Sequence, residues 1–194
     1  MEIHTIGSCP LCGGKHLTEY AYCTDNVISG ESYSLLECKE CGLVYTANAP
    51  SDKVAAKYEK LQQKLQLGES PKGIVNVLHY VCREIMLRRK CRLIRRLLGR
   101  KKGTLLNYGA KTGFFSDYMI PKNWAVTSVE KFYQERQFAL ELFHHRMIDV
   151  KDMIYIKEET FDVITLWHVL EHNNNPDELL KQFYKILKPD GILV

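Results

Sequence analysis

The C-terminal half of the chain alternates short, β-rich apolar runs with segments of helical periodicity, and this alternation constrains the fold most. The predicted strands are 104–108, 124–130, a weaker one at 146–150, 161–165 and 188–194. Between them, the segments with helical patterns are 114–119, 131–143 and 173–187. Strands that alternate with helices predict a parallel sheet, so we expect an α/β fold of the Rossmann-like, doubly wound type. Such sheets bind ligands at the carboxyl ends of their strands.

A glycine-containing turn follows the first of these strands. The stretch LLNYGAKTG places Gly109 and Gly113 directly after the apolar run, and the next strand ends in Glu130, 17 positions beyond Gly113. Glycine lets the backbone approach a ligand closely, and a carboxylate accepts hydrogen bonds from ribose hydroxyls. Together the turn and the carboxylate predict a nucleoside site.

Four cysteines form two Cys-x-x-Cys pairs in the first fifty residues, and each pair is followed by glycine. Cys9 and Cys12 lie in CPLCGG, and Cys38 and Cys41 lie in CKECGLVY. Two such turns supply the tetrahedral four-sulfur shell of structural zinc, which leaves no position open for water. We expect a zinc site that stabilises a small lobe, with a hairpin between the two pairs. Cys23 is expected to be a core or surface thiol, and Cys82 and Cys91 are expected to be core thiols.

Composition and charge limit the range of functions. Hydrophobic residues make up 45% of the 194 residues, which is enough for one or two domains with a buried core. The formal net charge is +4, so overall charge gives little reason to infer nucleic-acid binding. No apolar run approaches the roughly 20 residues that cross a bilayer, and we see no leader at the N-terminus. With paired cysteines that suit a reducing compartment, we expect a soluble, cytoplasmic protein with no membrane partner.

Residues 83–102 are strongly basic. Ten of these twenty residues are Lys or Arg and only Glu84 is acidic. They lie within a long helix expected from Ile74 onward, whose apolar stripe is expected to consist of Ile74, Val77, Leu78, Val81, Ile85, Leu93, Ile94, Leu97 and Leu98. A second helix is expected over 50–67. The basic face is either a solvated surface on a docked helix or a surface for phosphates on a substrate or RNA. Few aromatic residues stand among the basic ones to stack on bases, which argues against RNA.

The sequence resembles the class I S-adenosylmethionine-dependent methyltransferases, and in particular bacterial ones with an N-terminal four-cysteine zinc-binding lobe. The resemblance rests on the paired cysteine turns with CGLVY, the glycine loop, SVE, FDVITLWHVLEH and FYKILKPDGILV. It implies S-adenosylmethionine as the cofactor. It also implies three parts: a zinc-binding lobe at 1–50, a helical connector at 51–102 and a partial methyltransferase-like Rossmann domain at 103–194.

The resemblance implies roles for particular residues. The loop would hold the methionine part of the cofactor, Glu130 the ribose and Asp149 the adenine, while the fourth strand would bring cofactor and substrate together. The implied cofactor-binding residues are Asn107, Gly109, Lys111, Gly113, Glu130, Asp149, Trp167 and His168. His172 is either a general base or a structural histidine that fixes the turn before the Asn-rich loop.

The chain departs from the family pattern at two places. The loop has Asn107 where the family usually has an acidic residue, and Lys111 where it usually has glycine. If position 111 needs a left-handed backbone, its side chain costs about 1–2 kcal/mol. Val194 falls in the expected fifth strand of a seven-stranded fold, so we expect a fragment or a shortened gene product.

Three functions follow from these patterns. The first is methyl transfer from S-adenosylmethionine to a small-molecule or sugar-like acceptor, impaired by the loop. The second is a catalytically inactive methyltransferase-like module for binding or assembly. The third is a zinc-containing RNA-binding protein that uses the basic helix at 83–102. The patterns predict neither the acceptor atom nor the oligomeric state.

Overall fold

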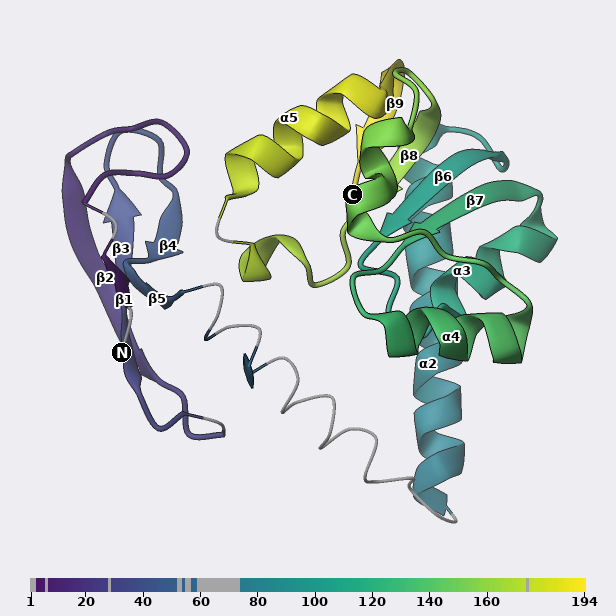
Figure 1. The fold of residues 1–194 in the computed structure, drawn as a ribbon, viewed down its shortest axis with the longest axis horizontal. Helices are drawn as coiled ribbons and strands as arrows, with labels where there is room; N and C mark the ends of the chain where they lie inside the picture. The colour runs from purple at the N-terminus through teal and green to yellow at the C-terminus, as the bar shows by residue number, and fades with distance from the viewer. Residues whose placement is uncertain are drawn as a thin grey trace. The chain divides into compact units, whose positions relative to one another are not determined.

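The chain divides into an N-terminal unit, which carries the paired cysteines, and an α/β unit built mainly from Gly73–Asn173 and Glu178–Val194 (Figure 1). The computed structural model describes residues 3–5, 7–27, 29–51, 54, 57, 58, 74–173 and 175–194. The helix expected over 50–67 lies mostly outside these described residues. Within them, no helix combines the length and apolar character that a membrane crossing requires.

The N-terminal unit is built from short antiparallel strands. Strand β2 (Leu17–Thr24) pairs with β3 (Ser32–Cys38), which pairs in turn with β4 (Val44–Thr46). A second small sheet joins β1 (Ile3–Thr5) to β5 (Asn48–Pro50). The hairpin expected between the two cysteine pairs is therefore confirmed.

The basic segment lies on helix α2 (Ile74–Leu98), which ends before Gly99 in a left-handed conformation with φ +70°. The helix was expected, but its packing face differs from the expected stripe. Leu87, Cys91 and Ile94 are buried, whereas six members of that stripe are exposed: Val77, Leu78, Val81, Ile85, Leu93 and Leu97. Of the two cysteines expected to be core thiols, Cys91 is buried and Cys82 is exposed, so the expectation for Cys82 was wrong.

Four parallel strands form the sheet of the α/β unit, in the order β7-β6-β8-β9 (Figure 1). They are β6 (Gly103–Tyr108), β7 (Trp124–Val129), β8 (Phe161–Thr165) and β9 (Leu187–Leu193). Helices lie between successive strands in the sequence: α3 (Phe114–Met119), α4 (Tyr133–Phe143) and α5 (Pro176–Ile186). The doubly wound parallel fold predicted from the alternating pattern is confirmed.

The weak strand expected at 146–150 is reduced to a single parallel bridge between Val129 and Ile148. Asp149 then caps a 3-10 helix over Val150–Tyr155 by accepting a hydrogen bond from the Lys151 N–H. The capping carboxylate ends the extended backbone after one bridge, so this segment lines the edge of the sheet beside β7 without extending the ladder.

The two faces of the sheet bury different side chains because successive residues of a strand point to opposite sides. On one face Leu105 and Val163 pack with Ile94 of α2 and Phe115 of α3. On the other face, the buried cluster joins residues of β6, β8 and α5: Leu106, Tyr108, Phe161, Ile164, Leu179, Phe183 and Ile186. Asn107 shares the α3 side with Leu105, which places its polar side chain inside the core.

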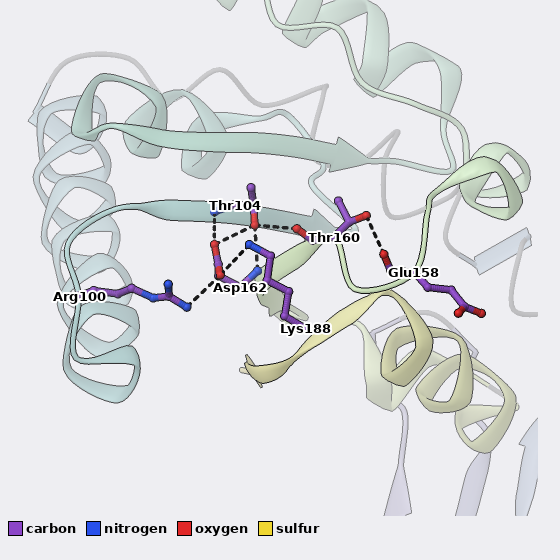
Figure 2. A network of polar contacts seen from close by, with 6 residues as sticks. All are labelled: Arg100, Thr104, Glu158, Thr160, Asp162 and Lys188. Carbon is purple, nitrogen blue, oxygen red and sulfur yellow. Dashed lines mark hydrogen bonds and ion pairs between the residues drawn. The ribbon is translucent and has the colours of Figure 1, made fainter.

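Asp162 anchors the starts of three strands around one buried carboxylate (Figure 2). Its Oδ2 accepts hydrogen bonds from the Thr104 N–H at 2.7 Å and hydroxyl at 2.9 Å. Its Oδ1 is 2.9 Å from both Arg100 Nη2 and Lys188 Nζ. Burial would raise the pKa of Asp162, but these partners outweigh it and lower the pKa to about 2. The cluster joins the end of α2 to β6, β8 and β9.

Candidate functional site

The strand order reverses between β6 and β8, so the carboxyl ends of these strands mark the switch point where doubly wound folds bind ligands. The loop 109–113 follows β6, and the segment 166–173 follows β8. The backbone N–H groups of Gly109 and Ala110 donate to the Val129 carbonyl of β7, at 2.9 and 3.0 Å. The loop is therefore folded against the end of the neighbouring strand.

Three loop residues have left-handed backbones: Gly109 with φ +69°, Lys111 with φ +48° and Gly113 with φ +83°. A Cβ at Gly109 would lie 2.5 Å from Val169 Cγ2, and one at Gly113 would lie 2.7 Å from Met147 Cε. A Cβ would therefore be crowded at both positions, and the left-handed backbone disfavours a side chain there. The left-handed backbone considered for Lys111 is present, with its side chain exposed.

Glu130 closes this loop from the end of β7. Its side chain is only 3% exposed, and its two oxygens accept separate backbone hydrogen bonds, Oε2 from Lys111 at 2.7 Å and Oε1 from Phe132 at 3.0 Å. Each carboxylate oxygen has two lone pairs, so one on each oxygen is left for a ligand hydroxyl. This geometry suits the ribose contact expected for Glu130.

Asn107 points into the core instead of toward the loop surface. It is 2% exposed; its amide nitrogen donates to Ser116 Oγ at 2.9 Å and its oxygen accepts from the Thr165 hydroxyl at 3.1 Å. Both ends of the amide are thus engaged by protein groups, one on α3 and one on β8.

Asp149 and Glu130 are linked by a shared partner, Arg136. Asp149 Oδ2 is 2.9 Å from Arg136 Nη2, while Arg136 Nη1 donates to the Glu130 carbonyl at 2.6 Å. The sequence analysis missed Arg136, although its position six residues after Glu130, in the first turns of α4, was an available signal. Arg136 therefore links the end of β7 to the segment that follows the bridge at Ile148. This link keeps Glu130 and Asp149 at the same edge of the sheet.

The residues after β8 fall into two groups. Trp167 is half-buried and meets Phe115 edge-on, with ring centroids 5.6 Å apart, and Lys90 Nζ stands 4.5 Å from the Trp167 ring centroid. His168 is exposed, with φ +56° and its Nδ1 3.4 Å from Glu171 Oε1. His172 is also exposed and ends the 3-10 helix Leu170–His172. Of these three expected site residues, Trp167 packs against the core of this unit, whereas the two histidines are exposed.

Charged groups surround the loop. Burial raises the pKa of Glu135, and the negative charge of the nearby Glu130 raises it further, while the positive charge of Lys111 lowers it in part. Burial lowers the pKa of Lys90, and the charge of Lys111 lowers it further. The loop is thus bordered by carboxylates on the α4 side and by ammonium groups on the α2 side, and a cationic ligand would be favoured on the α4 side.

The four paired cysteines converge at one point in the N-terminal unit. Their sulfur atoms all lie within 4.8 Å of one another, with Cys9 and Cys41 3.5 Å apart and Cys12 and Cys38 3.6 Å apart. Four sulfurs at about 2.3 Å from a tetrahedral zinc ion are separated by about 3.8 Å, so this set has the size of a zinc shell. The cluster fits a four-sulfur metal site.

The two cysteine turns share one backbone pattern, which explains the convergence. Cys9 N–H donates to the Gly14 carbonyl and Gly13 N–H donates back to Cys9; the second turn repeats this from Cys38 to Leu43 and Gly42. Burial would raise the pKa of Cys9, but hydrogen bonds from the backbone of Cys12 and Leu11 outweigh it and lower the pKa to about 7. Backbone hydrogen bonding from Gly14 would lower the pKa of Cys12, but burial and its contacts with the neighbouring cysteine sulfurs raise it to about 12. Within the first turn, Cys9 is therefore the cysteine that favours the thiolate form that metals bind.

Comparison with known proteins bears on the α/β unit. A family model described as a methyltransferase domain matches residues 82–194. The chain belongs to this methyltransferase family. The match begins within α2 and so extends upstream of residue 103, where the resemblance implied that this domain begins.

Two curated proteins are similar in sequence to part of the chain, and one solved structure is similar in fold. Two proteins named ubiquinone biosynthesis O-methyltransferase are each 28% identical to the chain over 104 residues, which are 49% of this chain and 43% of theirs; they come from Pseudomonas savastanoi pv. phaseolicola and Pseudomonas syringae pv. syringae. The chain spans less than half the length of these relatives. The PH0226 protein from Pyrococcus horikoshii OT3 has the same fold, with a TM-score of 0.51 and 20% identity over 59% of this chain and 56% of its own.

Proposed function

We propose that this methyltransferase domain binds S-adenosylmethionine at the loop 109–113 and transfers its methyl group to an oxygen of a small-molecule or sugar-like acceptor. The observation that carries the proposal is the closure of the loop on Glu130, with Gly109 and Gly113 in left-handed conformations where a Cβ would be crowded. The oxygen acceptor is suggested by the names of the two Pseudomonas relatives.

The residues present suit such a cofactor. Glu130 keeps lone pairs for the ribose hydroxyls, and Asp149 lies at the next edge position for the adenine. Gly109 and Gly113 let the backbone approach the methionine part, and Lys111 contributes its N–H to the loop while its exposed ammonium borders it. Trp167 and His168 follow β8, where the acceptor would enter, and His172 is the candidate base.

S-adenosylmethionine supplies a sulfonium-activated methyl group, so the chain's own residues have chiefly to bind and align the reactants. Trp167 presents its indole beside the aromatic ring of Phe115 and excludes water from one side. His172 would take the proton of an acceptor hydroxyl near neutral pH. Its exposure leaves the imidazole accessible to such an acceptor.

Calorimetric titration with S-adenosylhomocysteine tests the proposal. We expect binding by the wild type and a loss of at least about tenfold in Glu130→Gln, because a neutral amide offers only one acceptor atom to loop and ribose together. Glu141→Gln is the matched control, because it makes the same substitution at an exposed position of α4, the helix that follows Glu130 in the sequence. Absence of heat from the wild type at submillimolar ligand would overturn the proposal.

The cysteine cluster is proposed as a structural zinc site formed by Cys9, Cys12, Cys38 and Cys41. Four sulfurs fill a tetrahedral shell, so zinc would stabilise the N-terminal unit without taking part in catalysis. We propose the zinc-binding lobe at 1–50, the connector at 51–102 and the methyltransferase domain at 103–194 as working divisions. Reduced, metal-binding cysteines also favour a cytoplasmic location.

Two observations support other functions. Lys111 places a side chain where φ is +48°, and Asn107 is directed into the core, as a methyltransferase-like binding or assembly module without catalysis would allow.

Exposed arginines on α2 favour RNA as a partner; they are Arg88, Arg89, Arg92 and Arg96. If several phosphates were contacted, RNA affinity would fall steeply with salt, and undetectable affinity at low salt would exclude this role.

A further inference from the structure

A continuous line of hydrogen-bonded polar side chains joins five segments of the α/β unit: β8, β6, α3, β7 and the residues that follow α4. From β8, the Thr165 hydroxyl donates to Asn107 Oδ1 at 3.1 Å, and Asn107 Nδ2 donates to Ser116 Oγ at 2.9 Å. Ser116 Oγ lies 2.6 Å from Ser128 Oγ, which lies 2.7 Å from His145 Nε2. The four non-histidine members are each no more than 2% exposed.

The chain has a direction because each hydroxyl has a single proton. The Asn107 amide donates to Ser116, so the Ser116 proton is directed to Ser128 and the Ser128 proton to His145. His145 must then accept at Nε2, which makes it a neutral imidazole with its proton on Nδ1. The amide at one end thus determines the tautomer at the other.

Protonation of His145 would reverse this direction. A charged imidazole donates at Nε2, so Ser128 would donate to Ser116 and Ser116 would need an acceptor at position 107. Asn107 can provide this acceptor by rotating its amide, so that Oδ1 faces Ser116 and Nδ2 donates to Thr165. The Thr165 hydroxyl then donates to the Leu106 carbonyl, 3.3 Å away. An amide at position 107 supports both directions, whereas a carboxylate would support only the reversed one.

The geometry points to His145 as a positioning residue that sets the orientation of the Asn107 amide, through Ser128 and Ser116, and thereby the support of the cofactor loop. The neutral tautomer with its proton on Nδ1 fits the direction set by the Asn107 amide, and the charged form fits the reverse. The inference depends on the proposed function only for what the loop binds.

The surroundings of His145 favour the neutral form. Burial lowers the pKa of His145, and Asp117 of α3 opposes this as the charged group that acts on it. Ser128 of β7 is uncharged, and from α4 the Ala139 carbonyl accepts the His145 backbone N–H at 3.4 Å. Among the described residues, Asp117 is therefore the carboxylate that would stabilise a charge on His145, while burial opposes that charge.

The first experiment measures the tautomer and titration of His145 by nitrogen NMR. For the wild type we expect an unprotonated Nε2 at about pH 7.5 and a midpoint below the ordinary value of about 6.5. In Asn107→Asp the carboxylate can only accept, so Nε2 should carry a proton and the midpoint should rise by about one unit or more. A proton on Nε2 in the wild type, or an unchanged midpoint in the variant, overturns the inference.

Two further variants keep the test decisive if the buried aspartate unfolds the chain. Ser116→Ala breaks the line without adding charge, so His145 should lose its fixed tautomer while the fold stays intact. His145→Gln keeps an acceptor toward Ser128 but cannot be protonated. A Ser116→Ala variant in which the wild-type tautomer remains fully populated would also overturn the inference.

The second experiment reads out the loop. We expect S-adenosylhomocysteine affinity of the wild type to fall severalfold between about pH 7.5 and pH 5.5, and that of His145→Gln to stay nearly constant. An equal fall in both proteins overturns the link to the loop. If the wild type binds no S-adenosylhomocysteine at either pH, the proposed function fails, while the NMR result still decides the role of His145.

Discussion

The backbone N–H of Lys111 donates to Glu130 Oε2 at 2.7 Å, so the cofactor loop is closed by a main-chain contact that does not use the lysine side chain. Position 111 can therefore change its side chain without losing this contact. The lysine remains costly for two other reasons, its left-handed φ of +48° and a positive charge beside a loop expected to bind a sulfonium.

We predict that Lys111→Gly binds S-adenosylmethionine about tenfold more tightly than the wild type. The substitution removes about 1 kcal/mol of backbone strain and one ammonium group, and both changes favour the closed loop with a cationic ligand. Calorimetry on the two proteins measures the difference.

Two control variants separate these contributions. Lys111→Met keeps the strained backbone and removes the charge. Glu159→Gly relieves a comparable left-handed residue, with φ +50°, in the turn before β8 and so at the opposite edge of the sheet. Tighter binding by Glu159→Gly, or unchanged affinity in both Lys111 variants, would contradict the account of the loop.

The sequence was sufficient to predict the elements that depend on local pattern. Strands β6, β7, β8 and β9 and helices α4 and α5 lie where apolar runs and helical periodicity indicate. The third strand was overestimated, because the carboxylate of Asp149 caps a 3-10 helix after a single bridge. A short polar segment with an apolar flank does not reveal that competition.

Long-range polar contacts could not be predicted in the same way. Asp162 accepts from residues 58 positions before it and 26 after it, and nothing in FDVIT marks its carboxylate as buried. The line from Asn107 to His145 is equally invisible, since serines at 116 and 128 look like ordinary helix and strand residues. Asn107 was interpreted as a damaged cofactor contact, whereas the structure gives its amide two partners in the core.

The zinc proposal predicts about one zinc ion per chain in protein purified without chelators. Cys38→Ser should reduce this to well under one, because Cys38 is fully buried in the cluster and a serine hydroxyl is a poor replacement for thiolate. Elemental analysis of the purified proteins provides the measurement. Cys23→Ser is the matched control, since Cys23 is exposed on β2 outside the cluster; equal zinc loss in both variants would refute the four-cysteine site.

Asp162 predicts a specific acid sensitivity of the α/β unit. Its pKa of about 2 lies below the ordinary value near 3.8, so the folded state binds this proton less readily than the unfolded state. The resulting stability is complete above about pH 4 and is lost as the pH falls toward 2. Urea unfolding at several pH values should show this loss in the wild type.

Asp162→Asn should remove most of that pH dependence and lower the free energy of unfolding by about 2 kcal/mol near neutral pH, because Thr104, Arg100 and Lys188 lose a charged acceptor. Asp190→Asn removes the same charge from an exposed position on β9 and serves as the control. If the free energy of unfolding of Asp162→Asn fell with pH as steeply as that of the wild type, other carboxylates would govern acid unfolding.

The contact between Gly109 and Val169 provides a test in which one substitution should partly compensate another. A Cβ at position 109 would lie 2.5 Å from Val169 Cγ2, in a backbone with φ +69°. We expect Gly109→Ala to lower stability by about 2–3 kcal/mol, from left-handed strain and from this overlap together, and to weaken S-adenosylhomocysteine binding. Val169→Ala removes the overlapping methyl group but leaves the strain. The double variant should therefore be less destabilised than the sum of the two single variants, by about 1 kcal/mol in a double-mutant cycle. Strict additivity in thermal or urea unfolding would mean that the segment after β8 does not press on the loop, and that Gly109 is required for its backbone conformation alone.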